Sequence, residues 1–125
     1  MPSQEAAHAV RAVIALLVAG EYEELESLTE GRRLSAHQMR EALRGHVLIS
    51  PPAAALAGLR PAERVPDAGC EHSYLLDVPL WTAREGRSAL SVRLVLSEVM
   101  EHVWAVEVVA IGDVWHGGAP QAGPA

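Results

Sequence analysis

Residues 74–115 contain three stretches in which apolar side chains alternate with polar or small ones, and this feature limits the possible folds most strongly. Alternation with a period of two is typical of β-strands that bury one face. Two short polar segments, around residues 83–86 and around residues 99–100, separate the stretches and indicate hairpin turns. The sequence therefore predicts three consecutive antiparallel strands in its C-terminal half.

Pairing the strands across these turns assigns each side chain to one of the two faces of the sheet. The first turn predicts that Leu80 lies opposite Val92, and residues paired in this way share a face. The second turn predicts that Leu96 lies opposite Trp104. A register shifted by one residue would bury charged side chains, which costs free energy because they lose their hydration. The apolar face is therefore predicted to consist of Tyr74, Leu76, Val78, Leu80, Leu90, Val92, Leu94, Leu96, Trp104, Val106 and Val108.

Charged residues fall on the opposite face of the predicted sheet. In this register Arg93 lies opposite Glu107, and Asp77 lies diagonal to Arg93 on the other neighbouring strand. An arginine between two carboxylates is typical of a charge ladder on a solvated sheet face. We therefore interpret these three residues as structural rather than catalytic.

Helical patterns fill the N-terminal part of the chain. Ser3 is a candidate N-cap, apolar residues recur at helical spacing over residues 10–18, and Gly20 is a typical residue just after a helix end. Residues 21–28 predict a second, acidic helix, whose charged side is most simply a solvated face. Ser35, with Gln38 three residues later, predicts a capping box that opens a third helix.

Residues 50–69 are rich in Pro and Ala, which predicts a loop rather than a long regular element. Within this loop we expect a helical turn at residues 53–59 and a short edge strand at residues 64–65. Because helices come first and strands last, the predicted fold class is α+β, with N-terminal helices packed on one face of a C-terminal antiparallel sheet. That sheet contains the three-stranded meander and a fourth strand at its edge.

Length and charge limit the class of protein. The chain has 125 residues, which suits a single domain over residues 1–115, and residues 116–125 predict a disordered tail. A formal net charge of -6, without a basic stripe, argues against nucleic-acid binding. The apolar run at residues 12–20 is too short to span a membrane, and no basic segment of a signal peptide precedes it. We therefore expect a cytoplasmic protein that binds neither nucleic acid nor membrane.

One end of the predicted sheet collects side chains with reactive groups. Strands one and three run in the same direction, so their starts, at His72 and His102, lie at the same end as Cys70. Such residues can ligate zinc or activate a nucleophile, but no pair here has a known metal-ligand spacing. Exposed turn residues are the favoured interpretation, and we expect no metal or cofactor. In an enzyme, the first catalytic candidate would be Asp77, assisted by Tyr74, His72 or His102.

The other end of the predicted sheet places two tryptophans near charged turn residues. Tryptophan beside charges is typical of a contact patch, but equally of the rim of a core, where the indole N–H faces water. Both interpretations remain open. The binding candidates at this end are Trp81, Arg84, Glu85, Arg87 and Trp115.

Two segments, EYEELESLTEGRRLSA and LWTAREGRSALSVRLVL, resemble a small uncharacterised bacterial domain family. The family has a "DYEEL…LSAEE" region and an "LWT–EEGRSDLTL" hairpin, and the resemblance covers roughly residues 10–114. Ala89 stands where the family pattern has an acidic residue. The resemblance implies no established activity. More loosely, helices followed by a curved antiparallel sheet are similar to the cystatin-like superfold, which includes nuclear-transport-factor-like proteins.

Three functions fit these observations. The favoured hypothesis is a small cytoplasmic binding or accessory domain without enzymatic activity, which contacts a protein partner or a small apolar ligand and could form a homodimer. The second is a nuclear-transport-factor-like pocket enzyme of the cyclase, isomerase or epoxide-hydrolase type, acting in small-molecule biosynthesis. Such enzymes desolvate a carboxylate between helix and sheet, whereas the predicted apolar face contains no carboxylate. The third is an immunity-type protein that binds a basic partner through its acidic surface.

Overall fold

The computed structural model describes residues 3–30, 34–66, 70 and 72–113. The predicted tail at residues 116–125 and the binding candidate Trp115 lie outside these residues. In chain order the described elements are α1 (Gln4–Ala19), α2 (Tyr22–Leu28), α3 (Ala36–Ala42), β1 (Leu48–Ile49), α4 (Ala53–Ala57), β2 (Ala62–Arg64), β3 (His72–Thr82), β4 (Gly86–Met100) and β5 (Val103–Asp113).

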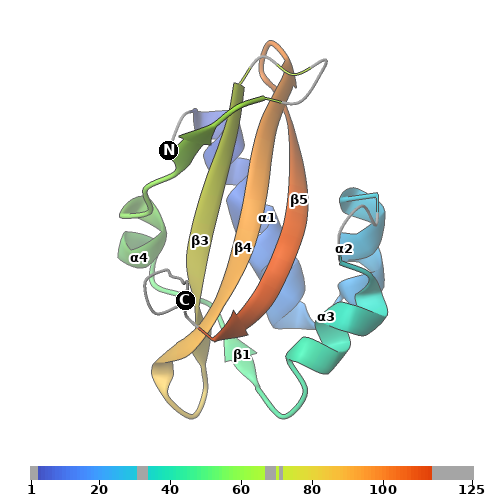
Figure 1. The fold of residues 1–125 in the computed structure, drawn as a ribbon. Coiled ribbons are helices and arrows are strands. Elements are labelled where there is room, and N and C mark those ends of the chain that lie inside the picture. Colours follow the sequence, from blue (N-terminus) through green and yellow to red (C-terminus); the bar gives the residue numbers. More distant parts are fainter. Residues whose placement is uncertain (1–2, 31–33, 67–69, 71, 114–125) are drawn as a thin grey trace, which may run out of the picture.

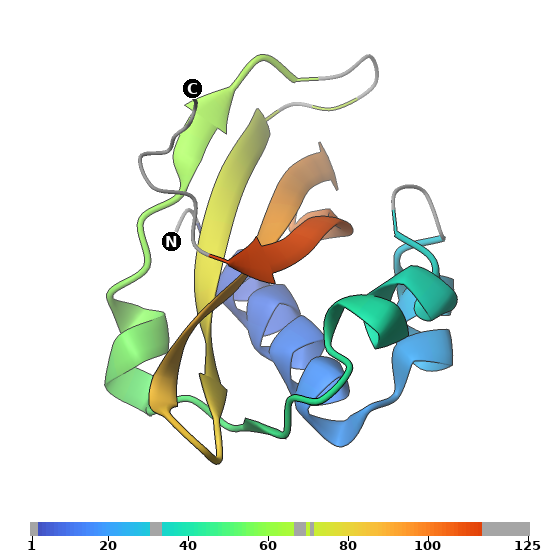
Figure 2. The same ribbon diagram turned by 60° about the horizontal axis from the view of Figure 1, so that its bottom comes forward.

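Helices and sheet form two layers. Figure 1 shows α1 crossing one face of the sheet, with α2 and α3 on the β5 side and α4 on the β3 side. Figure 2, turned by 60°, shows the same arrangement, with α1 beneath the long strands. The predicted α+β fold, with N-terminal helices on one face of an antiparallel sheet, is confirmed. Among the helices of the described ranges, none is long and apolar enough to cross a membrane.

Two short strands extend one edge of the meander. β3, β4 and β5 are antiparallel neighbours, and both β1 and β2 pair with β3 on the side away from β4. The predicted edge strand at residues 64–65 overlaps β2 only at Arg64, because β2 begins and ends earlier, and β1 was not predicted. Pro79 lies on β3 between the segments that pair with β1 and β2, a position that suits a residue without a backbone N–H.

The predicted strand registers are wrong by two residues at both hairpins. Val92 faces Val78 rather than Leu80, and Leu96 faces Val106 rather than Trp104. The second error arises because the turn lies at residues 101–102, not at residues 99–100. A shift of two residues leaves every side chain on its predicted face, since the pleat repeats every two residues.

The register changes the pairing of the charged residues on the outer face. Arg93 faces Asp77 directly, and Glu107 faces Val95. The predicted pairing of Arg93 with Glu107 is therefore wrong because the second hairpin is shifted, and Asp77 is opposite rather than diagonal to Arg93 because the first is shifted. A β-bulge next to Arg93 adds to the difference, since Arg93 pairs on its other side with Ala110.

The core lies between α1 and the inner face of the sheet. Every side chain predicted for the apolar face belongs to this core or packs against it. α1 contributes the side chains spaced for one helix face, namely Ala6, Val10, Val13, Ile14 and Leu17. Burial of each larger side chain contributes about 1.5–3 kcal/mol to folding, so this layer contact dominates the stability of the fold.

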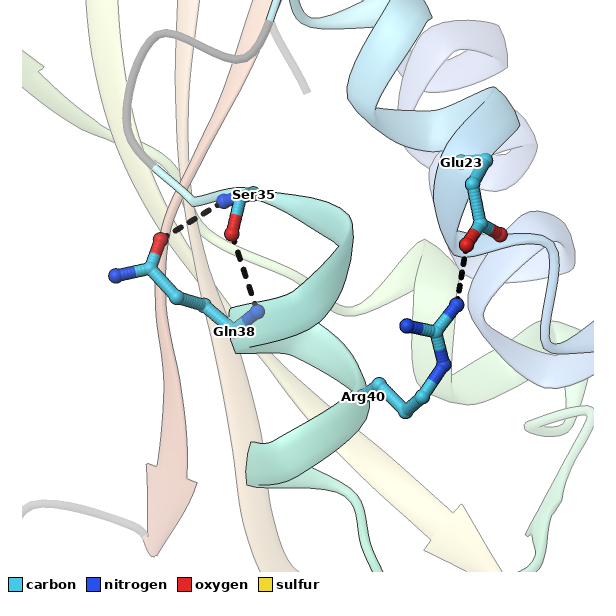
Figure 3. A network of polar contacts seen from close by, with 4 residues as sticks. All are labelled: Glu23, Ser35, Gln38 and Arg40. Carbon is cyan, nitrogen blue, oxygen red and sulfur yellow. Dashed lines mark hydrogen bonds and ion pairs between the residues drawn. The ribbon is translucent and has the colours of Figure 1, made fainter.

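Helix caps appear where the sequence predicts them. The Ser3 side chain accepts a hydrogen bond from the backbone N–H of Ala6 at 3.0 Å, and Gly20 ends α1 in the left-handed conformation at φ 75°. Ser35 and Gln38 form the reciprocal capping box of α3, which Figure 3 shows in detail. These bonds satisfy backbone donors that a helix leaves unpaired at its first turn.

One ion pair joins α2 to α3. Arg40 donates a hydrogen bond to the Glu23 carboxylate, as Figure 3 shows, and its guanidinium lies 5.6 Å from the centre of the Tyr22 ring. The hydrogen bond from Arg40 holds the pKa of Glu23 below its ordinary value. Both side chains are exposed, so the pair contributes little to the stability of the fold.

Candidate functional site

The turn between β3 and β4 projects past the end of β5 at one end of the sheet in both views (Figures 1 and 2). A cleft of about 490 Å³ lies between this turn and the connection from α3 to β1. This volume falls within the range of ordinary ligand and peptide pockets. We call it the turn cleft, and it is lined by Gly45, His46, Val47, Thr82, Ala83, Arg84 and Glu85.

Backbone pairing holds the two sides of the turn cleft together. Leu48 pairs with Thr82, and the backbone N–H of Ala83 donates to the carbonyl of Val47 at 2.9 Å. The Thr82 hydroxyl accepts a hydrogen bond from the backbone N–H of Glu85 at 3.1 Å, which fixes the start of the turn. Most residues that line the turn cleft lie in turns or loops, and these hydrogen bonds tie both of its walls to the adjoining strand ends.

Left-handed glycines shape both walls of the cleft. Gly45 has φ 82° and Gly86 has φ 70°, conformations that side-chain-bearing residues adopt only at a cost. A Cβ at residue 86 would lie 4.0 Å from the Trp81 ring, so the backbone conformation rather than crowding favours glycine there. Gly45 lines the cleft and Gly86 directly follows its other wall, and both suit sharp turns of the chain at these positions.

The surface around the turn cleft combines apolar and charged side chains. Val47 is 69% exposed and Ile49 is 40% exposed, so two aliphatic side chains close in sequence face solvent here. Arg84 and Glu85 are exposed on the turn, and Arg87 is exposed at the start of β4. An apolar centre beside a charged rim is typical of protein-contact surfaces.

Trp81 anchors the base of the projecting turn. It pairs with Arg87 across the hairpin and with Ile49 of β1 on its other side. Its indole N–H is buried, and no hydrogen-bond acceptor within the described part of the chain reaches it. The ring is half-buried, but the buried indole N–H differs from the predicted rim position, in which this group faces water; contact with a partner remains a prediction.

The predicted catalytic candidates do not share a site. Asp77 lies on the outer face of the sheet, whereas Tyr74 lies on the inner face, with its ring centre 5.9 Å from that of Trp104. His72 and His102 are exposed near the end of the sheet opposite the projecting turn. The structure therefore separates the four groups between two faces and one end of the sheet.

Weak ion contacts occupy that end of the sheet. His72 Nε2 lies 3.9 Å from Glu98 Oε1, and His102 Nδ1 lies 3.9 Å from Glu5 Oε2. Cys70 is half-buried and has a free thiol. Across the described ranges, no group of three or more His, Cys, Asp or Glu side chains is placed to hold a metal ion.

Two further hollows border α1. A groove of about 620 Å³ between α1 and α2 is lined by Ala12, Ala15, Leu16, Glu24, Ser27 and Leu28. A smaller hollow of about 290 Å³ lies between α1 and α4, where Arg11 contributes to the lining. Neither was predicted, because alternation and helix periodicity identify buried faces, whereas these hollows depend on how neighbouring helices pack.

Comparison with known protein families shows to which family this chain belongs. A family model described as a domain of unknown function (DUF7668) matches residues 14–114. The chain belongs to this family. The DUF7668 match runs from within α1 to the residue after β5 and includes the whole turn cleft. The predicted membership of a small uncharacterised family is thereby confirmed.

Beyond the DUF7668 family, no curated protein and no solved structure matches the chain. The site residues therefore come from the geometry alone. Of the predicted binding residues, Arg84 and Glu85 line the turn cleft, and Trp81 and Arg87 lie beside it. The wall from Gly45 to Val47 was not predicted, although the apolar Val47 and Ile49 on either side of Leu48 carry a strand-like signal.

Proposed function

We propose that this domain is a protein-binding module and that the turn cleft, with its exposed surroundings, is its contact surface. The observation that carries the proposal is the combination of a projecting, backbone-anchored turn with the exposed aliphatic residues Val47 and Ile49. Exposed aliphatic side chains grouped beside a cleft lower the free energy of a complex when a partner covers them.

The placement of the carboxylates supports a binding function over a pocket enzyme. A pocket enzyme of the cyclase or isomerase type needs a desolvated acid or base between helix and sheet. Here that space contains the fully buried side chains of Leu17, Val92 and Leu94. Asp77 lies on the opposite face, where Arg93 binds its carboxylate.

The chemistry of the contact surface indicates how a partner would bind. Val47 and Ile49 would pack against an apolar side chain of the partner, and burial of such groups supplies most of the binding free energy. Arg84, Glu85 and Arg87 would form the rim, where charges of both signs set orientation and specificity more than affinity. A short peptide segment of a protein partner fits both the size of the cleft and this mixture.

The proposal also includes the location of the domain, its resemblance in fold and its oligomeric state. We place the domain in the cytoplasm, in agreement with its acidic composition and single cysteine. The order of elements, helices before a long antiparallel sheet, supports the cystatin-like resemblance at the level of the fold. A homodimer remains an outcome that the binding experiment must separate from binding of another protein.

A displayed library of random peptides of about 12 residues tests the proposal, since a peptide of this length suffices to span the cleft. The library is selected on the immobilised domain, and enriched peptides are measured by fluorescence anisotropy. We expect binding that falls at least about tenfold in Val47→Asp and Arg84→Glu. Amide chemical shifts in the wild-type domain should move mainly at residues 45–49 and 82–87.

Matched variants control for nonspecific effects of charge. Val65→Asp introduces the same change at a residue that is 85% exposed on the far part of the β3 edge, and Arg60→Glu reverses a charge before β2. Both should retain the affinity of the wild type. The proposal would be contradicted if the selected peptides bound Val47→Asp with the affinity of the wild type. Changes in amide chemical shift centred away from the turn cleft would contradict it too. Sedimentation velocity shows in the same samples whether a second copy covers the surface instead.

A further inference from the structure

The groove between α1 and α2 carries a second inference, which is independent of the turn cleft because the two share no lining residue. We propose that this groove binds an amphipathic helix of another protein, with bulky apolar residues on one face and basic residues beside them. The observation behind the proposal is an exposed, mainly apolar groove with a carboxylate in its wall.

Small side chains form the α1 wall of the groove. Ala12 and Ala15 lie on the side of α1 away from the core, and Ala15 is exposed. Interhelical distances range from about 8 to 10 Å and depend on the side chains at the contact, so alanines permit close approach. Bulky residues of an incoming helix can therefore fill the groove without displacing its wall.

Larger apolar residues complete the groove. Leu16 packs partly against the core, and Leu28, at the end of α2, is 52% exposed. Leu28 falls on the groove side of α2 together with Glu24, four residues earlier, and Ser27. Apolar anchors spaced at i, i+3 or i+4, and i+7 on a partner helix match such a groove.

The negative charge at the groove between α1 and α2 favours a basic partner helix. Glu24 lines the groove, and Glu21, three residues earlier on α2, is exposed. Arg11 belongs to α1 but lines the hollow against α4, and Arg40 binds Glu23. Among the residues that line the groove in the described part of the chain, none is basic. Basic residues beside the apolar face of a helix would therefore be attracted to it.

The same charge argues against a second copy of this chain. Two copies joined through their grooves would bring two Glu24 carboxylates into one interface. Like charges placed together at an interface disfavour association, and each copy has a formal net charge of -6. A basic helix of another protein removes this repulsion and gains attraction instead.

Three synthetic peptides of about 18 residues, or five helical turns, test the inference. The first has leucines on one helix face and lysines on the others, the second scrambles the same residues, and the third replaces lysine by glutamate. Each carries a fluorophore and is titrated with the full chain by anisotropy. We expect the first to bind at least about tenfold more tightly than the second, and no measurable binding of the third.

Variants on exposed positions locate the binding site. Ala15→Arg fills the groove with a bulky cation while keeping a residue that favours helix. This variant should bind the first peptide at least about tenfold more weakly. Leu28→Asp should also lower the affinity for the first peptide, and Glu24→Gln should lower this affinity about two- to fivefold at low salt. Val65→Asp and Glu63→Gln, both exposed on or beside β2, are the matched controls and should bind as the wild type does.

Other outcomes would overturn the inference. Equal binding of the scrambled peptide would mean that charge alone attracts it, and unchanged binding by both Ala15→Arg and Leu28→Asp would place the peptide elsewhere. A dimer in sedimentation velocity that Ala15→Arg dissociates would make a second copy the occupant. Chemical shifts of wild-type Ala12, Ala15 and Leu28 provide a readout that needs no variant. The turn-cleft variant Val47→Asp should bind the peptide normally, so this inference and the proposed function can fail separately.

Discussion

Arg93 binds Asp77 across β3 and β4 with two parallel hydrogen bonds. Arg93 Nε donates to Asp77 Oδ1 at 2.8 Å, and Nη2 donates to Oδ2 at 3.1 Å. The bond to Asp77 raises the pKa of Arg93 above its ordinary value, although partial burial opposes this effect. The pair joins two neighbouring strands on the face away from the helices.

A double-mutant cycle measures this pair. Because the Asp77 side chain is 46% exposed, we expect Asp77→Asn and Arg93→Gln to show a coupling energy of only about 0.5 kcal/mol in denaturant unfolding. The exposed pair of Arg44 and Glu41 provides a reference for an ordinary surface contact. A coupling energy of several kcal/mol would show that the outer face is far less solvated than the exposures indicate.

The lowered pKa of Glu23 predicts a dependence of stability on pH. A carboxylate whose pKa is lower in the folded state stabilises the fold above its unfolded pKa, about 4.3, and loses this effect as pH falls through the folded pKa. Arg40→Gln should raise the pKa of Glu23 toward its ordinary value, as carboxyl carbon NMR titration would show. Arg44→Gln, which removes the neighbouring pair, should leave Glu23 unchanged. A Glu23 pKa that stays low in Arg40→Gln would contradict the assigned cause.

The left-handed conformation of Gly20 at the end of α1 should make replacement by alanine destabilising there. Gly20 has φ 75°, and a Cβ there would meet nothing within 4 Å, so Gly20→Ala should cost about 1 kcal/mol through the backbone alone. Gly58, which ends α4 at φ -88°, is the matched position, and Gly58→Ala should be close to neutral. Thermal unfolding of both variants gives the comparison. Equal effects at the two positions would rule out the left-handed conformation as the cause.

The buried hydroxyl of Ser88 is expected to stabilise the irregular segment of β4 opposite Leu80. Its hydroxyl donates to the Leu80 carbonyl at 2.8 Å and accepts from the Leu90 N–H at 3.1 Å, where the ladder between β3 and β4 is irregular. Ser88→Ala should leave both backbone groups without this partner and cost about 1–3 kcal/mol in urea unfolding. The exposed Ser50→Ala should change stability by less than about 0.5 kcal/mol. A neutral Ser88→Ala would mean that water replaces the hydroxyl.

Alternation predicted the faces of the sheet but not its pairing. Leu76, Val78 and Leu94 are buried as expected, because a period of two determines the face of each side chain. Two strand registers that differ by two residues bury the same side chains, so alternation cannot distinguish between them. The position of the turn decides the register, and the chain turns at Glu101 and His102, where His102 has φ 65°. A histidine in this conformation carries a much weaker turn signal than glycine does.

Local sequence predicted only one wall of the candidate site. Arg84 and Glu85 follow a strand directly, so their place in an exposed turn could be predicted. The opposite wall comes from residues more than thirty positions earlier, and β1 exists only because it pairs with the end of β3. Two-residue strands have too little periodicity to be recognised from sequence, so pairing between distant segments decides this part of the site.

α1 places Ala6, Val10 and Val13 in the core with at most 1% exposure, and all three precede residue 14, where the DUF7668 match begins. The length of chain that folds is thus greater than the length that defines the family. A fragment cut at the family boundary would lose the Ser3 cap and more than half of the helix that covers the sheet. Its strands would then keep their pairing partners but expose to water the apolar side chains that this part covers. Sample design for this domain should therefore follow the helix and not the boundary of the match.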